Sequence, residues 1–219
     1  MALYETPLVT VDIVIFTIVN GNLKVLLIRR KGPPFQHMWA IPGGFIRIGE
    51  TLEEAAERRL FEETNVKDIY LEQLVTFGTP NRDPRARIIT ISHYALIGSN
   101  KDIQPNANAE DVQWFSVHDL PDLAFDHKDI VECALLRLKE RLKTSNIAFQ
   151  LLGHKFTLTE LQRVYELILE KTLDKRNFRK KILSMGILME TDETKMEGYH
   201  RPAQLYAFRE RGRVQEYEV

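Results

Sequence analysis

Cysteine and long apolar runs are scarce in this sequence, and each shortage excludes a class of protein. Cys133 is the only cysteine in 219 residues, so no disulfide framework can form within one chain. No apolar run is long enough to span a bilayer. The first residues lack a basic region followed by an apolar segment and a small-residue cleavage site, which a secretion signal requires. We therefore expect a cytoplasmic protein that does not contact a membrane.

Neither sign of charge is in excess. The chain holds 30 Lys+Arg and 31 Asp+Glu, so its global charge points to no nucleic-acid, membrane or acidic partner. Its length suits one large domain or two modest ones, each able to bury a core. The sequence pattern favours two, which we place at residues 1–145 and 146–219.

The first domain reads as mixed α/β. Two β-branched-rich runs between Val9 and Arg30 are joined by Asn20-Gly21-Asn22, a strong hairpin signal. Thr51 and Glu54 have the spacing of a helix capping box. The helix that follows is expected to bury Leu52, Ala55, Ala56 and Leu60. Further strands are expected at 69–78, 87–98 and 112–117, and a further helix at 127–143.

The segment GFIRIGETLEEAAERRLFEETNV, from Gly44 to Val66, resembles the Nudix box. This box is the signature of enzymes that hydrolyse nucleoside diphosphates linked to another group. The positions that match are Gly44, Glu50, Arg58, Leu60, Glu62, Glu63 and Val66. Asn65 replaces the motif glycine at the end of the helix, where asparagine tolerates a left-handed cap. The resemblance implies a Nudix fold, with a mixed sheet between helices.

Arg59 is the departure that bears on activity, because active members have a glutamate directly after the motif arginine. Magnesium takes oxygen ligands, and diphosphate hydrolysis needs several carboxylates that converge on one point. On a helix, residue 59 shares a face with Glu62 and Glu63, so its permanent charge is expected to pair with both. We expect the metal to be replaced or strongly disfavoured. The alternative is that Arg59 points to solvent and the metal site survives with fewer ligands.

A second cationic cluster lies in the NRDPRAR loop, residues 81–87. Arginine side chains match phosphate oxygens in a bidentate manner, so this loop is a candidate anion site near the Nudix helix. The alternative is a solvated loop whose arginines pair with nearby acids. The candidate ligand-binding residues are Arg59, Arg82, Arg85, Arg87 and Trp39, with Phe35 as a second aromatic that could line the cleft.

The second domain resembles a winged helix-turn-helix. Thr157 and Glu160 predict a capped helix, and Asp174 caps a basic helix that ends at Gly186. Two strands are expected at 187–191 and 204–208. The basic helix is expected to bury Phe178, Ile182 and Leu183.

Such a helix suits the major groove of DNA, and its wing suits backbone phosphates. The candidate DNA-binding residues are Lys175, Arg176, Asn177, Arg179 and Lys180 on the helix, and Lys195 and Arg201 on the wing. The alternatives are a solvated cationic face and a winged module that binds protein or dimerises.

The whole arrangement resembles the Nudix-related transcriptional regulators. The resemblance rests on the damaged box, the NRDPR loop, Phe125-Asp126-His127, and the segments FTLTELQ, DKRNFRKKI and RPAQLY. Members of that family control genes of NAD metabolism in response to ADP-ribose, and related members respond to sugars such as arabinose. It implies a homodimer that binds a double-stranded DNA operator and senses ADP-ribose or a related nucleotide or sugar. No cofactor is required in that interpretation.

The competing hypothesis is a magnesium-dependent pyrophosphohydrolase that acts on ADP-ribose or a related nucleoside diphosphate derivative. Glu62 and Glu63 would then bind the metal with support from Glu50, and Glu110 or Asp111 would supply a distal carboxylate. A third possibility is a protein-interaction module with neither activity.

Overall fold

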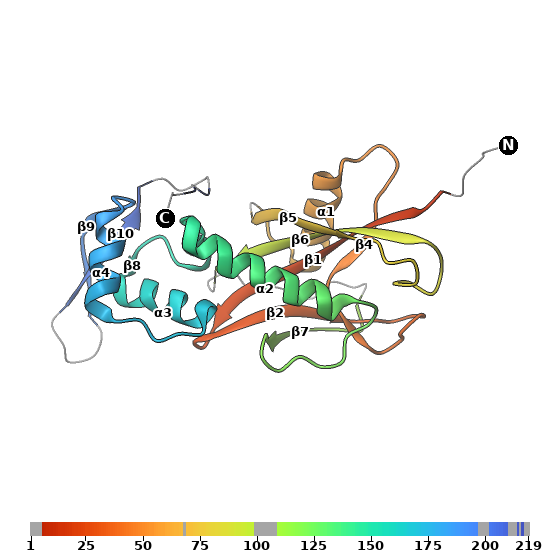
Figure 1. Ribbon diagram of the computed structural model, residues 1–219, viewed down its shortest axis with the longest axis horizontal. Coiled ribbons are helices and arrows are strands. Elements are labelled where there is room, and N and C mark those ends of the chain that lie inside the picture. Colours follow the sequence, from red (N-terminus) through yellow and green to blue (C-terminus); the bar gives the residue numbers. More distant parts are fainter. Residues whose placement is uncertain are drawn as a thin grey trace. The chain divides into compact units, whose positions relative to one another are not determined.

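The computed structural model describes residues 6–67, 69–98, 109–196, 202–209, 214 and 216. These residues divide into two compact units (Figure 1). The first takes in the chain up to Thr17, Lys24–Ile97 and the segment that ends at Arg137, and the second takes in Ile18–Leu23 and the chain from Leu138. The domain limits at 145 and 146 stay a prediction. No helix in the described ranges is long and apolar enough to cross a membrane.

A mixed sheet forms the first unit. Its strands among the described residues are β1 (Leu8–Val19), β2 (Asn22–Arg29), β3 (Trp39–Ala40), β4 (Gly43–Phe45), β5 (Tyr70–Phe77), β6 (Ile88–Ile97) and β7 (Asp111–Ser116). The order along the sheet is β3-β2-β1-β6-β5. β1 is parallel to β6, whereas β4 pairs antiparallel with β1, and β7 pairs antiparallel with β2. All the strands predicted in this region are confirmed, and the short strands β3 and β4 are additional to them.

The hairpin between β1 and β2 turns as predicted. Asn20 has φ 52° and Gly21 has φ 71°. Two positive φ values in succession are the mark of the tight turn that matches the twist of antiparallel strands. This turn fixes the register in which β2 returns beside β1.

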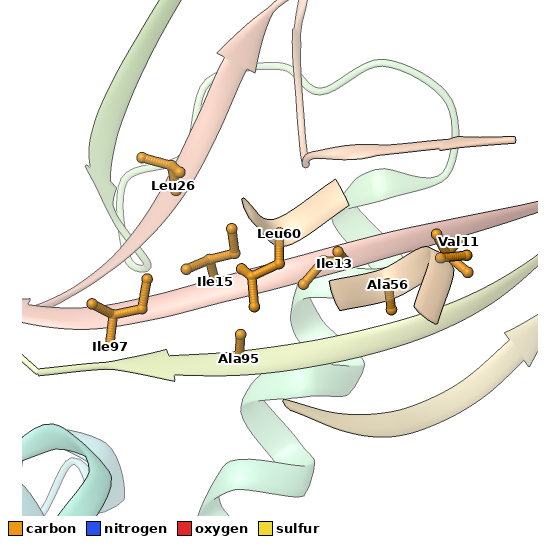
Figure 2. Packing of buried hydrophobic residues seen from close by; sticks show 9 residues of the cluster. Val11, Ile13, Ile15, Leu26, Ala56, Leu60, Ala95 and Ile97 are labelled. Atoms are coloured by element: carbon orange, nitrogen blue, oxygen red, sulfur yellow. The ribbon is translucent and has the colours of Figure 1, made fainter. Parts of the chain in front are cut away.

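Helices α1 (Leu52–Thr64) and α2 (His127–Thr144) cover the sheet (Figure 1). Figure 2 shows the cluster that α1 forms with it, in which Ala56 and Leu60 meet Ile13 and Ile15 of β1. The residues of β1 that alternate with Ile13 and Ile15 point to the other face of the sheet, and they are also buried. This strand, buried on both faces, carries the first residues of the candidate site.

The second unit is helical with a small antiparallel sheet. Its elements among the described residues are the 3-10 helix η1 (Ile147–Leu151), β8 (Phe156–Thr157), α3 (Leu158–Leu169), α4 (Lys175–Ser184), β9 (Leu188–Lys195) and β10 (Ala203–Phe208). β10 lies between β8 and β9. Phe208 packs against Phe149 and Phe156, with ring centroids 5.7 and 5.0 Å apart. Two helices followed by a hairpin confirm the winged helix architecture.

Two details of this unit differ from expectation. β9 runs to Lys195 rather than ending at residue 191, because its polar residues continue to pair with β10. Leu183 was expected to face inward, but it is 45% exposed. Ile182 is the buried residue of α4, and a helix this short has room for only a narrow buried stripe.

Candidate functional site

The box helix α1 begins and ends as its sequence predicts. Thr51 Oγ1 accepts a hydrogen bond from Glu54 N at 3.1 Å, and Glu54 Oε2 accepts one from Thr51 N at 2.7 Å. Asn65 closes the helix in the left-handed conformation, with φ 54°, and donates its N–H to Phe61 O at 2.7 Å. The exchange of glycine for asparagine therefore leaves the shape of the motif intact.

Glu50 and Arg58 form a bidentate pair at the start of the box. Arg58 donates from Nε and Nη2 to the two Glu50 oxygens, at 2.9 and 2.7 Å. The hydrogen bonds from Arg58 are the main cause that lowers the pKa of Glu50 to about 2. Arg58 also donates to Glu62 at 3.2 Å. Glu50 therefore acts as an anchor for Arg58, which in turn holds Glu62.

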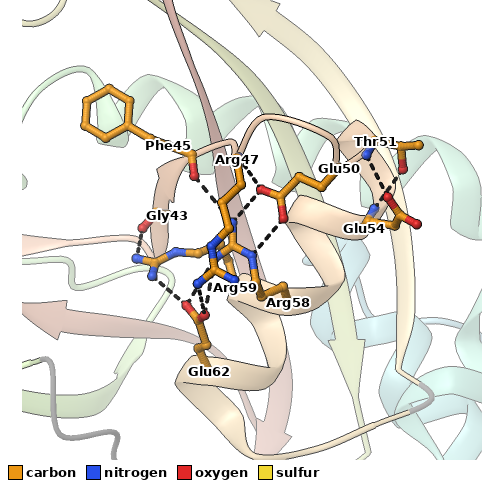
Figure 3. Close-up of polar contacts among 9 residues, drawn as sticks. All are labelled: Gly43, Phe45, Arg47, Glu50, Thr51, Glu54, Arg58, Arg59 and Glu62. Carbon is orange, nitrogen blue, oxygen red and sulfur yellow. Dashed lines mark hydrogen bonds and ion pairs between the residues drawn. The ribbon is translucent and has the colours of Figure 1, made fainter.

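Figure 3 shows the side chain of Arg59 between Glu62 and the backbone of Gly43. Its Nη1 donates to Glu62 Oε2 at 2.7 Å, and its Nη2 lies 3.7 Å from Glu63 Oε1 and also donates to Gly43 O. The side chain is 20% exposed. A Cβ at Gly44 would lie 2.7 Å from Arg59 Nε, so this motif glycine leaves room for the guanidinium. The predicted pairing with both glutamates is confirmed, and the solvent-pointing alternative is wrong.

Glu62 and Glu63 have opposite electrostatic environments. Burial by itself would raise the pKa of Glu62, but hydrogen bonds from Arg59 and Arg58 bring it below its ordinary value. Glu63 is 2% exposed, its Oε2 has no hydrogen-bond partner, and burial raises its pKa despite the nearby charge of Arg59. Arg59 thus stabilises one carboxylate directly and offsets part of the desolvation of the other.

These residues do not fit a magnesium ion. Both oxygens of Glu62 accept hydrogen bonds from arginines, and a guanidinium occupies the space between the paired glutamates. The described residues contain no group of three or more His, Cys, Asp or Glu side chains placed to hold a metal. Glu110 and Asp111 are the candidate distal carboxylates, and both have protein partners. Glu110 Oε2 forms a 2.8 Å hydrogen bond with His37 Nδ1. Asp111 accepts hydrogen bonds from Val112 N and Gln113 Nε2.

A cavity of about 240 Å³ lies beside the box in the first unit. Its polar lining residues are Thr10, Asp12, Arg30, Arg82, Asp83, Arg85 and His127, and its aromatic ones are Phe45 and Phe125. Gly43 and Gly44 also line it. The structure therefore brings two arginines of the NRDPR loop to the start of the Nudix box.

Arg82 and Arg85 differ in how far they are committed to protein partners. Arg82 is 3% exposed and makes a bidentate pair with Asp126, at 2.8 and 2.6 Å, together with a 3.4 Å bond to Asp12. Arg85 pairs with Asp83 at 2.6 Å but is 41% exposed. Burial alone would lower the pKa of Arg82, and the two carboxylates raise it. Arg82 is therefore a buried, ion-paired residue of the cavity lining, whereas the side chain of Arg85 is accessible to solvent.

Three other predicted ligand residues, Arg59, Arg87 and Trp39, lie outside the cavity lining. The ring of Trp39 packs edge-on against Phe115, with centroids 4.8 Å apart, and Arg87 is exposed. Phe35 is closer to the site, because its ring packs 4.8 Å from that of Phe125. Trp39 does not line the cavity, whereas Phe125 does.

His127 joins the cavity to the sheet. Its Nδ1 accepts a hydrogen bond from Ile41 N at 3.1 Å, and its Nε2 lies 3.9 Å from Asp12 Oδ2. Burial is the main cause that lowers the pKa of His127, so the ring is neutral and its proton is on Nε2. The neutral side chain of His127 therefore positions its neighbours and contributes no positive charge to the cavity.

The predicted DNA-binding residues differ in how exposed their side chains are. Lys175, Arg176, Asn177 and Lys180 are exposed on α4. Arg179 was expected on the same exposed arc but is partly buried, with its Nη2 3.5 Å from Thr159 Oγ1 and a buried Nε that has no partner. Lys195 donates to Glu160 at 2.6 Å. Arg201 lies outside the described residues.

Comparisons with known proteins agree with both halves of this arrangement. The NUDIX domain family model matches residues 8–133, and the NrtR DNA-binding winged helix domain model matches residues 148–208. The chain is 39% identical over 209 residues, 94% of its length and 83% of the relative's, to the ADPR responsive transcriptional repressor NtrR of Acinetobacter baylyi. The chain belongs to the NrtR family of Nudix-domain transcriptional regulators.

Solved structures of NrtR-family proteins extend the likeness to the fold. NrtR of Shewanella oneidensis complexed with a 27mer DNA matches with a TM-score of 0.81 and 37% identity, over 92% of this chain and 93% of that one. The NUDIX domain of the same NrtR complexed with ADP ribose matches with a TM-score of 0.56 and 40% identity, over 62% of this chain and 90% of that one.

Sequence reasoning about this NrtR-family chain missed three residues at the cavity. Asp12 is the charged residue of the buried strand β1, and a buried charge of this kind demands a partner. Arg30 follows the apolar run of β2, where it resembles an ordinary surface residue. Phe125 belongs to the Phe125-Asp126-His127 segment, and its φ of 56°, which is unusual for a bulky side chain and marks a functional or strained position, cannot be read from the sequence.

Proposed function

We propose that this protein is a cytoplasmic transcriptional regulator that binds a DNA operator through its winged domain and ADP-ribose through its Nudix domain. It acts as a homodimer, and its box recognises the diphosphate without cleaving it. The names of its relatives support the effector and the DNA partner. The observation that carries the proposal is the position of Arg59 between Glu62 and Glu63.

The electrostatics of that position favour sensing over hydrolysis. Cleavage of a diphosphate needs a concentrated positive charge on the phosphate oxygens, which a divalent ion bridged to carboxylates normally provides. Here the guanidinium of Arg59 neutralises the carboxylates internally. A bound diphosphate would therefore meet a site in which the metal ligands are already paired.

Regulation requires that effector binding and DNA binding change each other's free energy. Couplings of this kind are typically about 1 to 3 kcal/mol, and they are reciprocal. Because the effector site and the winged helix lie on separate units, a change of ADP-ribose occupancy must be transmitted to α4. DNA must then alter the affinity for ADP-ribose by the same factor.

The test is a fluorescence anisotropy titration of the full chain with a duplex selected by binding from a randomised library. ADP-ribose is added with and without magnesium, and free AMP is measured in the same samples. We expect ADP-ribose to change the DNA affinity about 5- to 150-fold, without magnesium and without AMP release. Equal DNA affinity with and without ADP-ribose would refute the proposal.

A hydrolase remains the second candidate, because the box retains the motif residues Glu50, Arg58, Glu62 and Glu63. It requires magnesium-dependent release of AMP and ribose phosphate from ADP-ribose at enzyme-like turnover. That result would show that Arg59 moves aside when metal and substrate bind. A protein-interaction module would instead show no thermal shift with either DNA or nucleotide.

A further inference from the structure

An apolar pocket of about 460 Å³ lies wholly within the second unit, and no residue of the Nudix box lines it. Leu142 of α2, Leu169 of α3 and Ile182 of α4 form part of its wall, together with Leu173 between α3 and α4. Pockets of roughly 300 to 1,000 Å³ bury most of the surface of a small ligand. This pocket is therefore large enough for a small molecule with an apolar body.

Tyr165 adds one polar group to the apolar wall. Its ring packs edge-on against that of Phe178, with the centroids 5.3 Å apart, and both residues line the pocket. Burial raises the pKa of Tyr165 to about 12, and within the described ranges its hydroxyl has no hydrogen-bond partner. A buried tyrosine hydroxyl usually has such a partner, so this one is available to donate to a ligand oxygen.

Two lysines of the pocket have no ion pair. Lys143 of α2 and Lys181 of α4 line it and are exposed, and neither has a hydrogen bond or an ion pair in the part of the chain that the structure describes. Asp174 is the acidic residue of the lining, and it caps α4 by accepting a hydrogen bond from Asn177 N at 2.8 Å. Two cations and one anion give the lining a net positive charge.

The apolar wall and the lysines favour the same kind of ligand. A lysine lays its methylene stem along an apolar surface and keeps its ammonium group in water. A ligand that suits both features has an apolar chain for the wall and an anionic head for the ammonium groups. A fatty acid of medium chain length has this chemistry, because its carboxyl group is ionised at neutral pH. A nucleotide does not, since an apolar wall would desolvate its polar groups without replacing their hydrogen bonds.

We infer that this pocket binds a medium-chain monocarboxylate, with the alkyl chain against Leu142, Leu169 and Ile182 and the carboxylate beside Lys143 and Lys181. The candidate DNA-binding helix α4 supplies two of these residues, so the bound acid contacts that helix directly. The pocket is thus a second small-molecule site, and it shares no residue with the cavity beside the Nudix box. Binding of the acid is independent of the proposed function, whereas its effect on DNA rests on it.

The first test measures binding of hexanoate, octanoate, 1-octanol and octylamine to the full chain by calorimetry. Each buried methylene group raises affinity about fourfold, so octanoate should bind about 15-fold more tightly than hexanoate. We expect 1-octanol to bind more weakly than octanoate, and octylamine more weakly still. Equal affinities for hexanoate and octanoate would overturn burial of the chain, and octylamine binding as tightly as octanoate would overturn the role of the lysines.

Three variants locate the site. Lys143→Gln and Lys128→Gln remove the same charge from exposed positions of α2, but only Lys143 lines the pocket. We expect Lys143→Gln to weaken octanoate about 2- to 5-fold and to leave 1-octanol unchanged, while Lys128→Gln changes neither. Leu173→Trp, which fills the pocket, should abolish octanoate binding. If Leu173→Trp does not fold, the two lysine variants decide, and equal octanoate affinities for them would overturn the site.

Two further measurements separate the site from its consequence. Octanoate should change the affinity of the full chain for the selected duplex at least about 5-fold, and an unchanged affinity would overturn the effect on α4. A wild type that binds no octanoate, with a Leu173→Trp variant that sediments as a smaller species, would show that a second copy of the chain covers the pocket and would overturn the inference. Since octanoate binding is measured without DNA or ADP-ribose, failure of the proposed function would leave that result intact.

Discussion

Arg59 and Glu62 are joined by a 2.7 Å ion pair one helical turn apart on α1. The same guanidinium is 3.7 Å from Glu63, so one arginine contacts both acids that a Nudix hydrolase would present to its metal. Since positions three and four apart on a helix share a face, an arginine at position 59 lies beside both acids.

We predict that Arg59→Glu creates a magnesium site. A third carboxylate on this face would join Glu62 and Glu63, and ligand binding to the folded state raises its stability by mass action. Magnesium at about ten times its dissociation constant should raise the free energy of unfolding of this variant by about 1.4 kcal/mol. Thermal melts with and without magnesium measure the effect. Arg59→Gln, which removes the cation without adding an acid, should respond less, and an equal response of the two variants would count against the prediction.

Glu50→Gln should destabilise the protein in a manner that depends on pH. The pKa of Glu50 is about 2 in the folded state, mainly because of its hydrogen bonds from Arg58, and its ordinary value is 4.5. A lowered folded pKa gives stability that is present above pH 4.5 and is lost as the pH falls through about 2. Urea unfolding should show a deficit for Glu50→Gln at pH 7 that shrinks below pH 4.5. Glu57→Gln, an exposed change on the same helix, should show no such trend.

Glu63→Gln should behave in the opposite sense. Burial raises the folded pKa of Glu63 above its ordinary value of 4.5, so the contribution of this carboxyl is full below pH 4.5 and is lost as the pH rises through the folded value. A neutral amide does not undergo that loss. The stability of Glu63→Gln relative to the wild type should therefore increase from pH 4 to pH 7 in urea unfolding. A constant or decreasing difference would show that Arg59 fully compensates the buried charge.

Arg82→Gln should destabilise the Nudix domain by about 3 to 5 kcal/mol, the usual cost when one partner of a buried ion pair is removed. Asp126 and Asp12 would lose their cation while largely buried. The matched control is Arg87→Gln in the same loop, where the side chain is exposed and the change should stay within about 0.5 kcal/mol. Chemical denaturation measures both variants, and similar values for the two would refute the role assigned to Arg82.

Local spacing in the sequence was sufficient to predict the elements of the box. The capping box of Thr51, the left-handed Asn65 and the pairing of Arg59 all depend on residues within four positions of each other. The partners of Arg82 could not be predicted in this way. Asp126 and Asp12 lie 44 and 70 positions away, and only the assembled sheet and α2 bring them together.

The basic helix shows the same limit on a smaller scale. Helical spacing places Arg176 and Arg179 close together on one surface, and both were expected to be exposed. The packing of α4 on α3, which includes the contact of Phe178 with Tyr165 at 5.3 Å, decides which of them faces solvent. Sequence periodicity predicts how wide the buried stripe of a helix is. Tertiary packing determines how the helix is rotated about its own axis, and this can move the stripe by one or two residues.

That rotation leads to a prediction about DNA binding by α4. Arg176 is exposed, whereas Arg179 lies against Thr159. Each phosphate contact that is lost reduces the slope of log affinity against log salt by about 1. Arg176→Gln should therefore lower the slope by about 1 in anisotropy titrations over several salt concentrations, while Arg179→Gln should leave the slope unchanged and alter thermal stability instead. Because the two substitutions remove the same side chain from the same helix, an equal loss of slope would show that Arg179 turns outward to meet DNA.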